Sequence, residues 1–314
     1  MRALKERLLE FLFPTESDAW LSILRVGLGF QITLYSLSLR NDWNYLFAGA
    51  GSANGLVNRD LAEALLSIES RFAPRLGWLA TLGAQVGLRE EAVLSILWIC
   101  LFAAGCSLVA GVACRFSAIL AWFLHLCAAK SGGFISYGVD NFMTIGLFYL
   151  MLSPLPDRYA LDWQLRKSQP EASPFLGFWR RVLQLHLCVI YFFSGLTKCL
   201  GSGWWDGSNV WRSLIRPPFN VIDPELLVRW KYLFPAGGIF ICLLEITYPF
   251  FIWNDKTRKI WLVCICAMHA GIGFMMGMYL FALIMIILNV AAFGTGFIRA
   301  ESAPISLQSQ EVVS

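Results

Sequence analysis

Residues 91–113 read EAVLSILWICLFAAGCSLVAGVA, and Glu91 is the only charged residue in this run. At about 1.5 Å of rise per residue, a helix of this length spans the roughly 30 Å hydrocarbon core of a membrane. The eight segments with this apolar character cover residues 19–39, 91–113, 117–136, 141–155, 179–200, 233–253, 260–276 and 278–298. The pattern predicts an all-α fold, a polytopic membrane helix bundle of about eight transmembrane segments with interfacial helices.

The composition of the whole chain agrees with this class. Of its 314 residues, 57% are hydrophobic and 15% are charged, against about 25% charged residues in soluble domains. The net charge is only +4, and no basic run is long enough to bind a phosphate backbone, so nucleic acid is excluded as a partner. The nine cysteines have no paired CxxC spacing, so neither a disulfide framework nor a metal site is predicted.

The chain divides into three parts. Residues 1–18 alternate basic and apolar side chains and predict a cytoplasmic interfacial segment rather than a cleaved signal peptide. Residues 19–298 form the transmembrane domain. Residues 299–314 are polar and predict a disordered cytoplasmic tail.

The distribution of Lys and Arg predicts the topology. With eight crossings, the basic residues of the short loops fall on one side, which the positive-inside rule makes cytoplasmic. Both termini are then cytoplasmic, and the long loops 40–90 and 201–232 face outward. The amphipathic stretch from Asn58 to Phe72 either lies flat on the membrane or caps a cavity. The Trp, Gly and Pro residues of loop 201–232 form either a lid or an interface anchor.

Ionisable side chains within apolar segments are the candidate functional residues, because each costs at least about 2.5 kcal/mol to insert into a membrane. Lys198 lies in YFFSGLTKCLGSGWWDG, residues 191–207, near the outer end of the fifth segment. Helical spacing places it on one face with Tyr191. Two interpretations stay open: a lysine that snorkels to the headgroups, and a desolvated neutral amine that acts as a base.

Three further polar residues are predicted at the same outer level. His269 either moves a proton or stabilises an oxyanion, or it makes an interhelical hydrogen bond. Asp140 either caps the helix that it begins or joins Asn141, Lys198 and His269 in one pocket.

The remaining intramembrane polar residues favour structural interpretations. Arg25 and Glu245 are each expected to have a partner, because an unpaired ion in hydrocarbon is unfavourable. Glu245 is either such a structural partner or a proton carrier. His125 and His186 are expected to be structural.

The run RRVLQLHLCVIYFFSGLTKCLGSGWWDGSNVW, residues 180–211, resembles the signature of the horizontally transferred transmembrane (HTTM) domain of the vitamin K-dependent gamma-carboxylase family. The residues that carry the resemblance are Tyr191, Phe192, Ser194, Gly195, Lys198, Trp205, Asp206 and Gly207. Weaker similarity extends from about Trp20 to Phe297. Asp140 and Asn141 depart from the family pattern, which has an Asn-His pair there.

The resemblance implies a gamma-carboxylase-like lyase or quinol epoxidase in a bacterial inner membrane. Its cofactor is a reduced naphthoquinone, menaquinol or vitamin K hydroquinone, bound in an outward-facing pocket without a metal. By resemblance, Lys198 is the catalytic base and His269 a second catalytic residue. The substrate-binding residues are then Asp140, Asn141, Tyr191, Trp205 and Asp206. The implied partners are membrane lipid and a peptide or small protein substrate.

Two alternatives stay open. In the first alternative, the chain is a non-catalytic membrane module, an immunity or peptide-maturation factor, in which Lys198 pairs with Asp206 or Glu245. A transporter is the third interpretation, although no inverted repeat is visible in the sequence.

Overall fold

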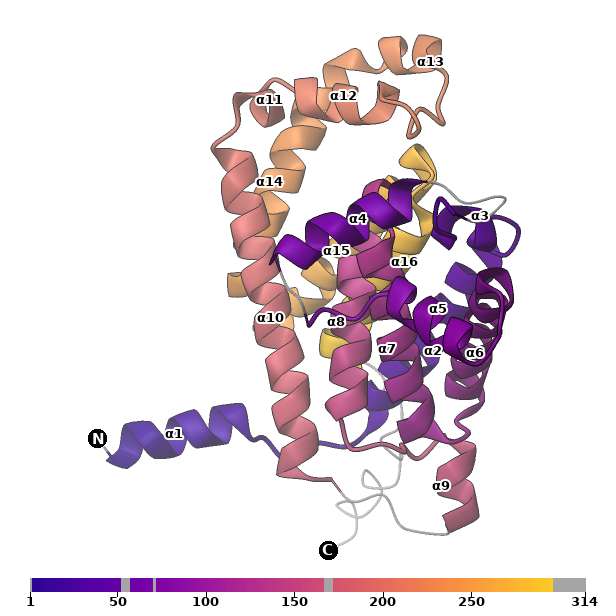
Figure 1. The fold of residues 1–314 in the computed structure, drawn as a ribbon. Coiled ribbons are helices and arrows are strands. Elements are labelled where there is room, and N and C mark those ends of the chain that lie inside the picture. Colours follow the sequence, from indigo (N-terminus) through magenta and orange to yellow (C-terminus); the bar gives the residue numbers. More distant parts are fainter. Residues whose placement is uncertain (1, 52–56, 70–71, 167–171, 296–314) are drawn as a thin grey trace, which may run out of the picture.

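The structure, a computed structural model, describes residues 2–51, 57–69, 72–166 and 172–295 (Figure 1). Helices and short turns account for these residues, and the one β-type pairing among them is an isolated bridge between Glu16 and Ser173. The predicted all-α class is therefore confirmed. The predicted tail, residues 299–314, lies outside the described residues.

Each predicted apolar segment lies on one helix: α2 (Ala19–Ser38), α6 (Glu90–Ala110), α7 (Cys114–Ser131), α8 (Gly138–Leu152), α10 (Pro174–Cys199), α14 (Phe234–Phe251), α15 (Asp255–Met276) and α16 (Tyr279–Phe293). Five candidate spans among the described residues are long and apolar enough to cross a membrane. They are α2, α6, α10, α15 and α14 together with the short helix η2 (Lys231–Leu233). Helices α8 and α16 are apolar but shorter.

Shorter helices connect the spans: α1 (Arg2–Leu12), α3 (Trp43–Phe47), α4 (Val57–Glu69), α5 (Leu76–Gln85), η1 (Gly133–Ile135), α9 (Leu161–Arg166), α11 (Ser202–Trp205), α12 (Ser208–Ile215) and α13 (Pro224–Arg229). Figure 1 shows α11, α12 and α13 at one end of the bundle and α1 and α9 at the other. Helix α3 lies toward the first of these ends, because Trp43 Nε1 donates to the Leu94 carbonyl near the start of α6. Both long loops therefore lie toward the same end.

Small residues let the helices pack closely. A Cβ added at Gly29 of α2 would lie 2.7 Å from Val109 N and 2.9 Å from the Gly105 carbonyl oxygen of α6. Without a hydrophobic force between helices in lipid, such close backbone approach supplies the packing energy. The same device recurs between α10 and α14, where it positions the candidate site.

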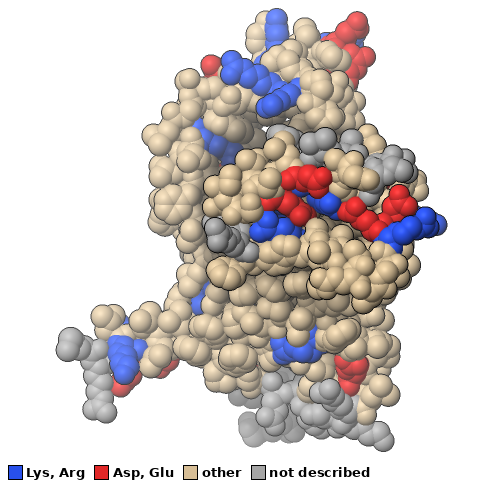
Figure 2. Space-filling model, viewed as in Figure 1, with Lys and Arg blue, Asp and Glu red and all other residues tan. Residues whose placement is uncertain are grey.

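The surface of the bundle is that of a membrane protein. On the face in Figure 2, charged side chains gather at the upper end, in a band at the height of α4 and toward the lower end, and a mostly uncharged surface lies between the band and the lower end. Large apolar side chains on the spans are exposed rather than buried, among them Phe30, Ile99, Phe193, Phe250 and Val263. A water-soluble protein rarely exposes so continuous an apolar surface, whereas lipid requires it.

Arg25 has the buried partner that was expected. Its guanidinium forms an ion pair with Asp157 after α8, and the two side chains are 1% and 0% exposed. Arg25 Nη1 also donates to the Leu108 carbonyl at 2.5 Å, and Ser22 Oγ donates to Asp157 Oδ1 at 2.6 Å. The pair ties α2, α6 and the chain after α8 together at the end of the bundle near α9.

Candidate functional site

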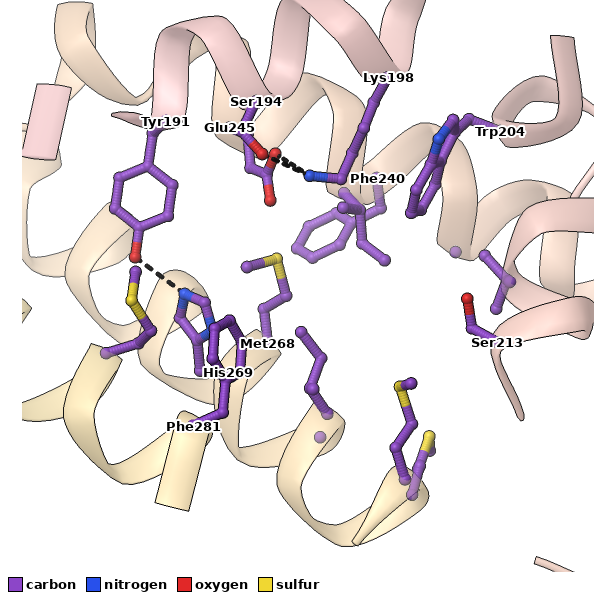
Figure 3. Close-up of a pocket in the computed structure, with 18 of the residues that line it drawn as sticks. Tyr191, Ser194, Lys198, Trp204, Ser213, Phe240, Glu245, Met268, His269 and Phe281 are labelled. Carbon is purple, nitrogen blue, oxygen red and sulfur yellow. Dashed lines mark hydrogen bonds and ion pairs between the residues drawn. The ribbon is translucent and has the colours of Figure 1, made fainter. Parts of the chain in front are cut away.

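A cavity of about 440 Å³ lies among α8, α10, α14, α15 and α16, with α11 and α12 at one end (Figure 3). Small-molecule sites have volumes of about 300–1,000 Å³ and mostly apolar walls with a few polar groups. This cavity has both properties. Its apolar walls include Phe142, Phe240, Phe281, Met268, Met275, Met276 and Met285, and its polar groups are Tyr191, Ser194, Lys198, Ser213, Glu245 and His269.

Lys198 lies in the last turn of α10 and turns its ammonium toward the cavity wall. Its Nζ donates to Glu245 Oε2 at 2.6 Å and to Ser194 Oγ at 2.6 Å. Nζ also lies 5.4 Å from the ring centroid of Trp204, a distance typical of a cation–π contact. The Lys198 side chain is 20% exposed and that of Glu245 is 6% exposed. The lysine is therefore held by partners inside the bundle and does not extend freely to the headgroups.

Gly195 brings this ion pair together. A Cβ at Gly195 would lie 2.4 Å from Ile246 N and 2.9 Å from Ile246 Cα, so α10 and α14 touch through their backbones. Because residues three apart lie on one helix face, Lys198 stands beside the same stretch of α14. Glu245 is the neighbour of Ile246 and comes within reach of the ammonium.

Helices α11 and α12 of the second long loop close one end of the cavity and are called the roof below. Gly207 adopts φ +79° between α11 and α12, a conformation that favours glycine, and a Cβ there would lie 2.5 Å from Phe234 C. A Cβ at Gly238 would lie 2.1 Å from the Trp204 carbonyl oxygen, so α11 rests directly on α14. Trp204 of α11 and Leu214 of α12 line the cavity. Of the two interpretations of this loop, the arrangement favours the lid.

A hydrogen-bonded chain begins at Tyr191 and His269 in the cavity wall and continues behind them. The hydroxyl of Tyr191 lies 2.8 Å from His269 Nε2, and Asn289 Nδ2 donates to the same hydroxyl at 2.7 Å. Tyr248 in turn donates to Asn289 Oδ1 at 2.7 Å. The four residues belong to α10, α15, α16 and α14, so the chain joins four helices across the bundle. His269 is 3% exposed, and its Nδ1 has no hydrogen-bond partner among the described residues.

Asp140 and Asn141 lie away from this cavity. Asp140 caps α8, where its Oδ2 accepts from Tyr137 N at 2.9 Å and from Ser136 Oγ at 3.1 Å. It borders a separate cavity of about 160 Å³ beside Tyr35, and Asn141 borders a third of about 260 Å³. The single pocket of four polar residues is not formed. Lys198 and His269 share the main cavity, whereas Asp140 caps α8.

Trp205 and Asp206 also lie outside the cavity lining. Trp205 Nε1 donates to the Cys199 carbonyl at 2.8 Å, and Asp206 Oδ1 accepts from Ser208 N at 2.8 Å. The hydrogen bonds from Ser208 lower the pKa of the exposed Asp206 carboxyl below its ordinary value. Of the two acidic partners considered for Lys198, Glu245 makes the contact, and both Trp205 and Asp206 hold the roof in shape.

The other two histidines bond within the bundle. His125 Nδ1 lies 3.1 Å from Thr144 Oγ1, and His186 Nδ1 lies 2.5 Å from the Tyr149 hydroxyl. Neither lines the main cavity. Within the described ranges, no group of three or more His, Cys, Asp or Glu residues is placed to hold a metal ion.

Sequence reasoning missed three residues of this site. Asn289 is a polar residue within the apolar segment 278–298, and the insertion cost that singled out His269 would have marked it as well. Tyr248 and Trp204 carried no such signal, because Tyr and Trp are common in membrane helices and at interfaces. Only the neighbours that folding brings to them distinguish Trp204 from Trp205.

Comparison of the chain with known protein families, with curated proteins and with solved structures finds no match. The proposal of a function therefore rests on the geometry around Lys198 and His269.

Proposed function

We propose that the protein is a multi-pass membrane enzyme that binds a reduced naphthoquinone, menaquinol or vitamin K hydroquinone, in this cavity and removes a proton from it. The observation that carries the proposal is the Lys198–Glu245 ion pair, which stands in the wall of an otherwise apolar cavity. An ionisable pair beside an apolar hollow is a candidate proton acceptor for a lipid-soluble substrate.

The proposed topology has eight crossings in a bacterial inner membrane, with both termini cytoplasmic. Five candidate spans and the shorter apolar helices α8 and α16 support it. Helix α7, which carries the third predicted segment, would bring the number to eight, and an even number returns the chain to its starting side. The grouping of α11, α12 and α13 at the end opposite α1 and α9 supports an outward position for the roof (Figure 1). The cavity would then open near the outer surface.

The residues of the cavity fit a reduced naphthoquinone. The fused ring is flat and apolar with an oxygen on each side, and the cavity offers apolar walls with polar groups on two sides. Lys198 and Glu245 would hold one oxygen, and His269, whose Nδ1 is buried without a partner among the described residues, would hold the other. When bound, the reduced quinone supplies a hydroxyl group whose deprotonated form reacts with oxygen.

The residues of this chain would then hold the proton and exclude water. Lys198 Nζ and Glu245 Oε2 lie 2.6 Å apart and can accept one proton as a unit. Ser194 holds the amine in place, and the α11–α12 roof with Trp204 shields the pair. Exclusion of water protects a basic intermediate from being quenched.

The same ion pair favours a second candidate, the non-catalytic membrane module. Here Glu245 neutralises a permanently charged Lys198, and the cavity binds a lipid or the apolar part of a peptide. The module would act as an immunity or peptide-maturation factor. A guanidinium can replace the ammonium in such a pair but cannot act as the base.

An assay for quinol epoxide tests the enzyme. The protein in lipid nanodiscs is given menaquinol and oxygen, and the products are separated by chromatography. We expect the epoxide from the parent protein and its loss in Lys198→Ala. Lys231→Ala is the matched control, because Lys231 is exposed at the same end of the bundle and lies outside the cavity lining.

Each remaining outcome decides between the candidates. No epoxide from the parent protein overturns the enzymatic proposal, and unchanged epoxide in Lys198→Ala removes this lysine from the chemistry. Lys198→Arg separates the two functions. Where the parent protein forms epoxide, loss of epoxide in Lys198→Arg with normal membrane insertion supports the base. Full ligand binding by both the parent protein and Lys198→Arg, with no epoxide from either, supports the binding module.

A further inference from the structure

The hydrogen-bonded chain behind His269 has a direction. Asn289 Nδ2 lies 2.8 Å from the Met285 carbonyl oxygen, which can only accept, and this contact fixes which atom of the amide is the nitrogen. The amide oxygen therefore faces Tyr248 and accepts its hydroxyl proton at 2.7 Å. The second amide proton goes to the Tyr191 oxygen, also at 2.7 Å.

The direction continues from Tyr191 to His269. Because the Tyr191 oxygen already accepts from Asn289, its own proton is free to go to His269 Nε2, 2.8 Å away. The reverse arrangement would leave both the Tyr191 proton and the lone pair of His269 Nδ1 unpaired in buried surroundings. His269 Nε2 therefore accepts, and the proton of the neutral ring lies on Nδ1.

This Nδ1–H is buried and has no oxygen to receive it among the described residues. His269 lines the cavity, and Figure 3 shows its second nitrogen on the edge of the ring turned away from Tyr191. The Phe281 ring packs edge to face against it at a centroid distance of 5.8 Å. An aromatic ring is a weak acceptor compared with an oxygen lone pair. The buried donor is thus left for a ligand.

We infer that His269 is a fixed Nδ1–H donor that binds an acceptor oxygen, carbonyl or phenolic, on the ligand of the cavity. Tyr191, Asn289 and Tyr248 are positioning residues that hold His269 in this protonation form. The inference rests on the proposed function for the naphthoquinone class of the ligand, but the position of the proton does not depend on it. A site with a dedicated buried donor discriminates strongly against analogues that lack the acceptor.

The protonation form is tested first, without any ligand. ¹⁵N NMR of histidine-labelled protein in nanodiscs separates protonated from bare ring nitrogens, and the His269→Gln variant assigns the His269 signals by their loss. We expect a protonated Nδ1 and a bare Nε2. Tyr191→Phe removes only the hydroxyl group, and in this variant we expect the His269 proton to be shared between Nδ1 and Nε2. A proton on Nε2 in the parent protein, with Nδ1 bare or also protonated, overturns the inference.

The ligand side is tested with menadione and methylnaphthalene, which share a fused ring and differ in the two oxygens. By titration calorimetry we expect His269→Gln to weaken menadione binding about tenfold, since a hydrogen bond to a buried donor is lost. His269→Asn is the conservative variant, because its amide nitrogen can stand near the position of Nδ1, and it should recover most of the affinity. Methylnaphthalene should bind the parent protein and all variants equally.

These results separate the inference from the proposed function. If menadione moves the Nδ1 signal and loses affinity in His269→Gln while no epoxide is ever formed, the donor site stands and the enzymatic proposal falls. If the parent protein and His269→Gln bind menadione equally, the donor site falls, even where epoxide is formed. Equal thermal midpoints of the variants exclude unfolding as the cause of a lost affinity.

Discussion

The ion pairs Arg25–Asp157 and Lys198–Glu245 both lie inside the bundle, and they differ in what surrounds them. Arg25–Asp157 is 1% and 0% exposed, and Ser22 and the Leu108 carbonyl complete its hydrogen bonds. Lys198–Glu245 is 20% and 6% exposed and borders a cavity. The first pair is enclosed by protein and fastens helices. The second has an open side from which a ligand can reach it.

The choice of cation agrees with this difference. A guanidinium has five donors in a rigid fork and suits a fixed site with several acceptors, as around Arg25, whose three nitrogens all donate. An ammonium has three rotatable donors on a flexible chain, and Lys198 uses two of them on Glu245 and Ser194. The predictions below test whether one pair serves stability and the other serves binding.

The largest effect is expected at the enclosed pair. Asp157→Ala leaves the Arg25 guanidinium buried without its carboxylate, and the free energy of unfolding should fall by about 3–5 kcal/mol. Thermal unfolding in detergent measures it. Asp42→Ala is the control, because Asp42 is exposed and makes no side-chain cap bond. A stability equal to that of the parent protein would contradict the structural role of this pair.

A smaller loss of stability is expected at the open pair. Lys198→Met keeps the length of the side chain, and its loss of a charged hydrogen bond should cost about 1.5–3 kcal/mol. The free energy of menadione binding should change more than the free energy of unfolding, since the pair borders the cavity. The comparison between the two pairs fails if Lys198→Met unfolds the protein as severely as Asp157→Ala and leaves binding intact.

A similar loss is expected at the helix contact that builds the open pair. Gly195→Ala places a methyl group against Ile246 N, and such overpacking should cost about 1–3 kcal/mol. It should also move Lys198 from Glu245 and weaken menadione binding. Gly51→Ala is the control, because a Cβ there meets nothing within 4 Å and Gly51 lies outside the cavity lining. Equal behaviour of the two alanine variants would show that close helix contact does not position the pair.

The smallest effect is expected at Ser194. Ser194→Ala removes one hydrogen bond from Lys198 Nζ and should cost about 0.5–1.5 kcal/mol. Menadione affinity should fall slightly through the less well-held amine. Thr197→Ala is the control on the same helix, because Thr197 Oγ1 bonds only backbone carbonyls of its own turn. A larger loss in the Thr197 variant than in the Ser194 variant would contradict this ranking.

Some side chains have a large insertion cost in a membrane whatever the fold. Lys198 and His269 stood out for this reason, and both line the main cavity. Asp140 and Asn141 were grouped with them by depth alone. Depth along a helix follows from residue number, but the side that a residue faces depends on the rotation of its helix against its neighbours, and Asp140 borders another cavity.

The sequence by itself determined that the chain is a bundle of apolar helices and where its apolar segments lie, because length and hydropathy are local properties that lipid selects directly. It also indicated that Arg25 and Glu245 needed partners. Only the tertiary structure decided which partners they have. The contact of Gly195 with α14 chose Glu245 over Asp206, and four separate helices had to meet before Tyr248, Asn289 and Tyr191 could orient His269. Such contacts join residues far apart in the chain, and no local pattern encodes them.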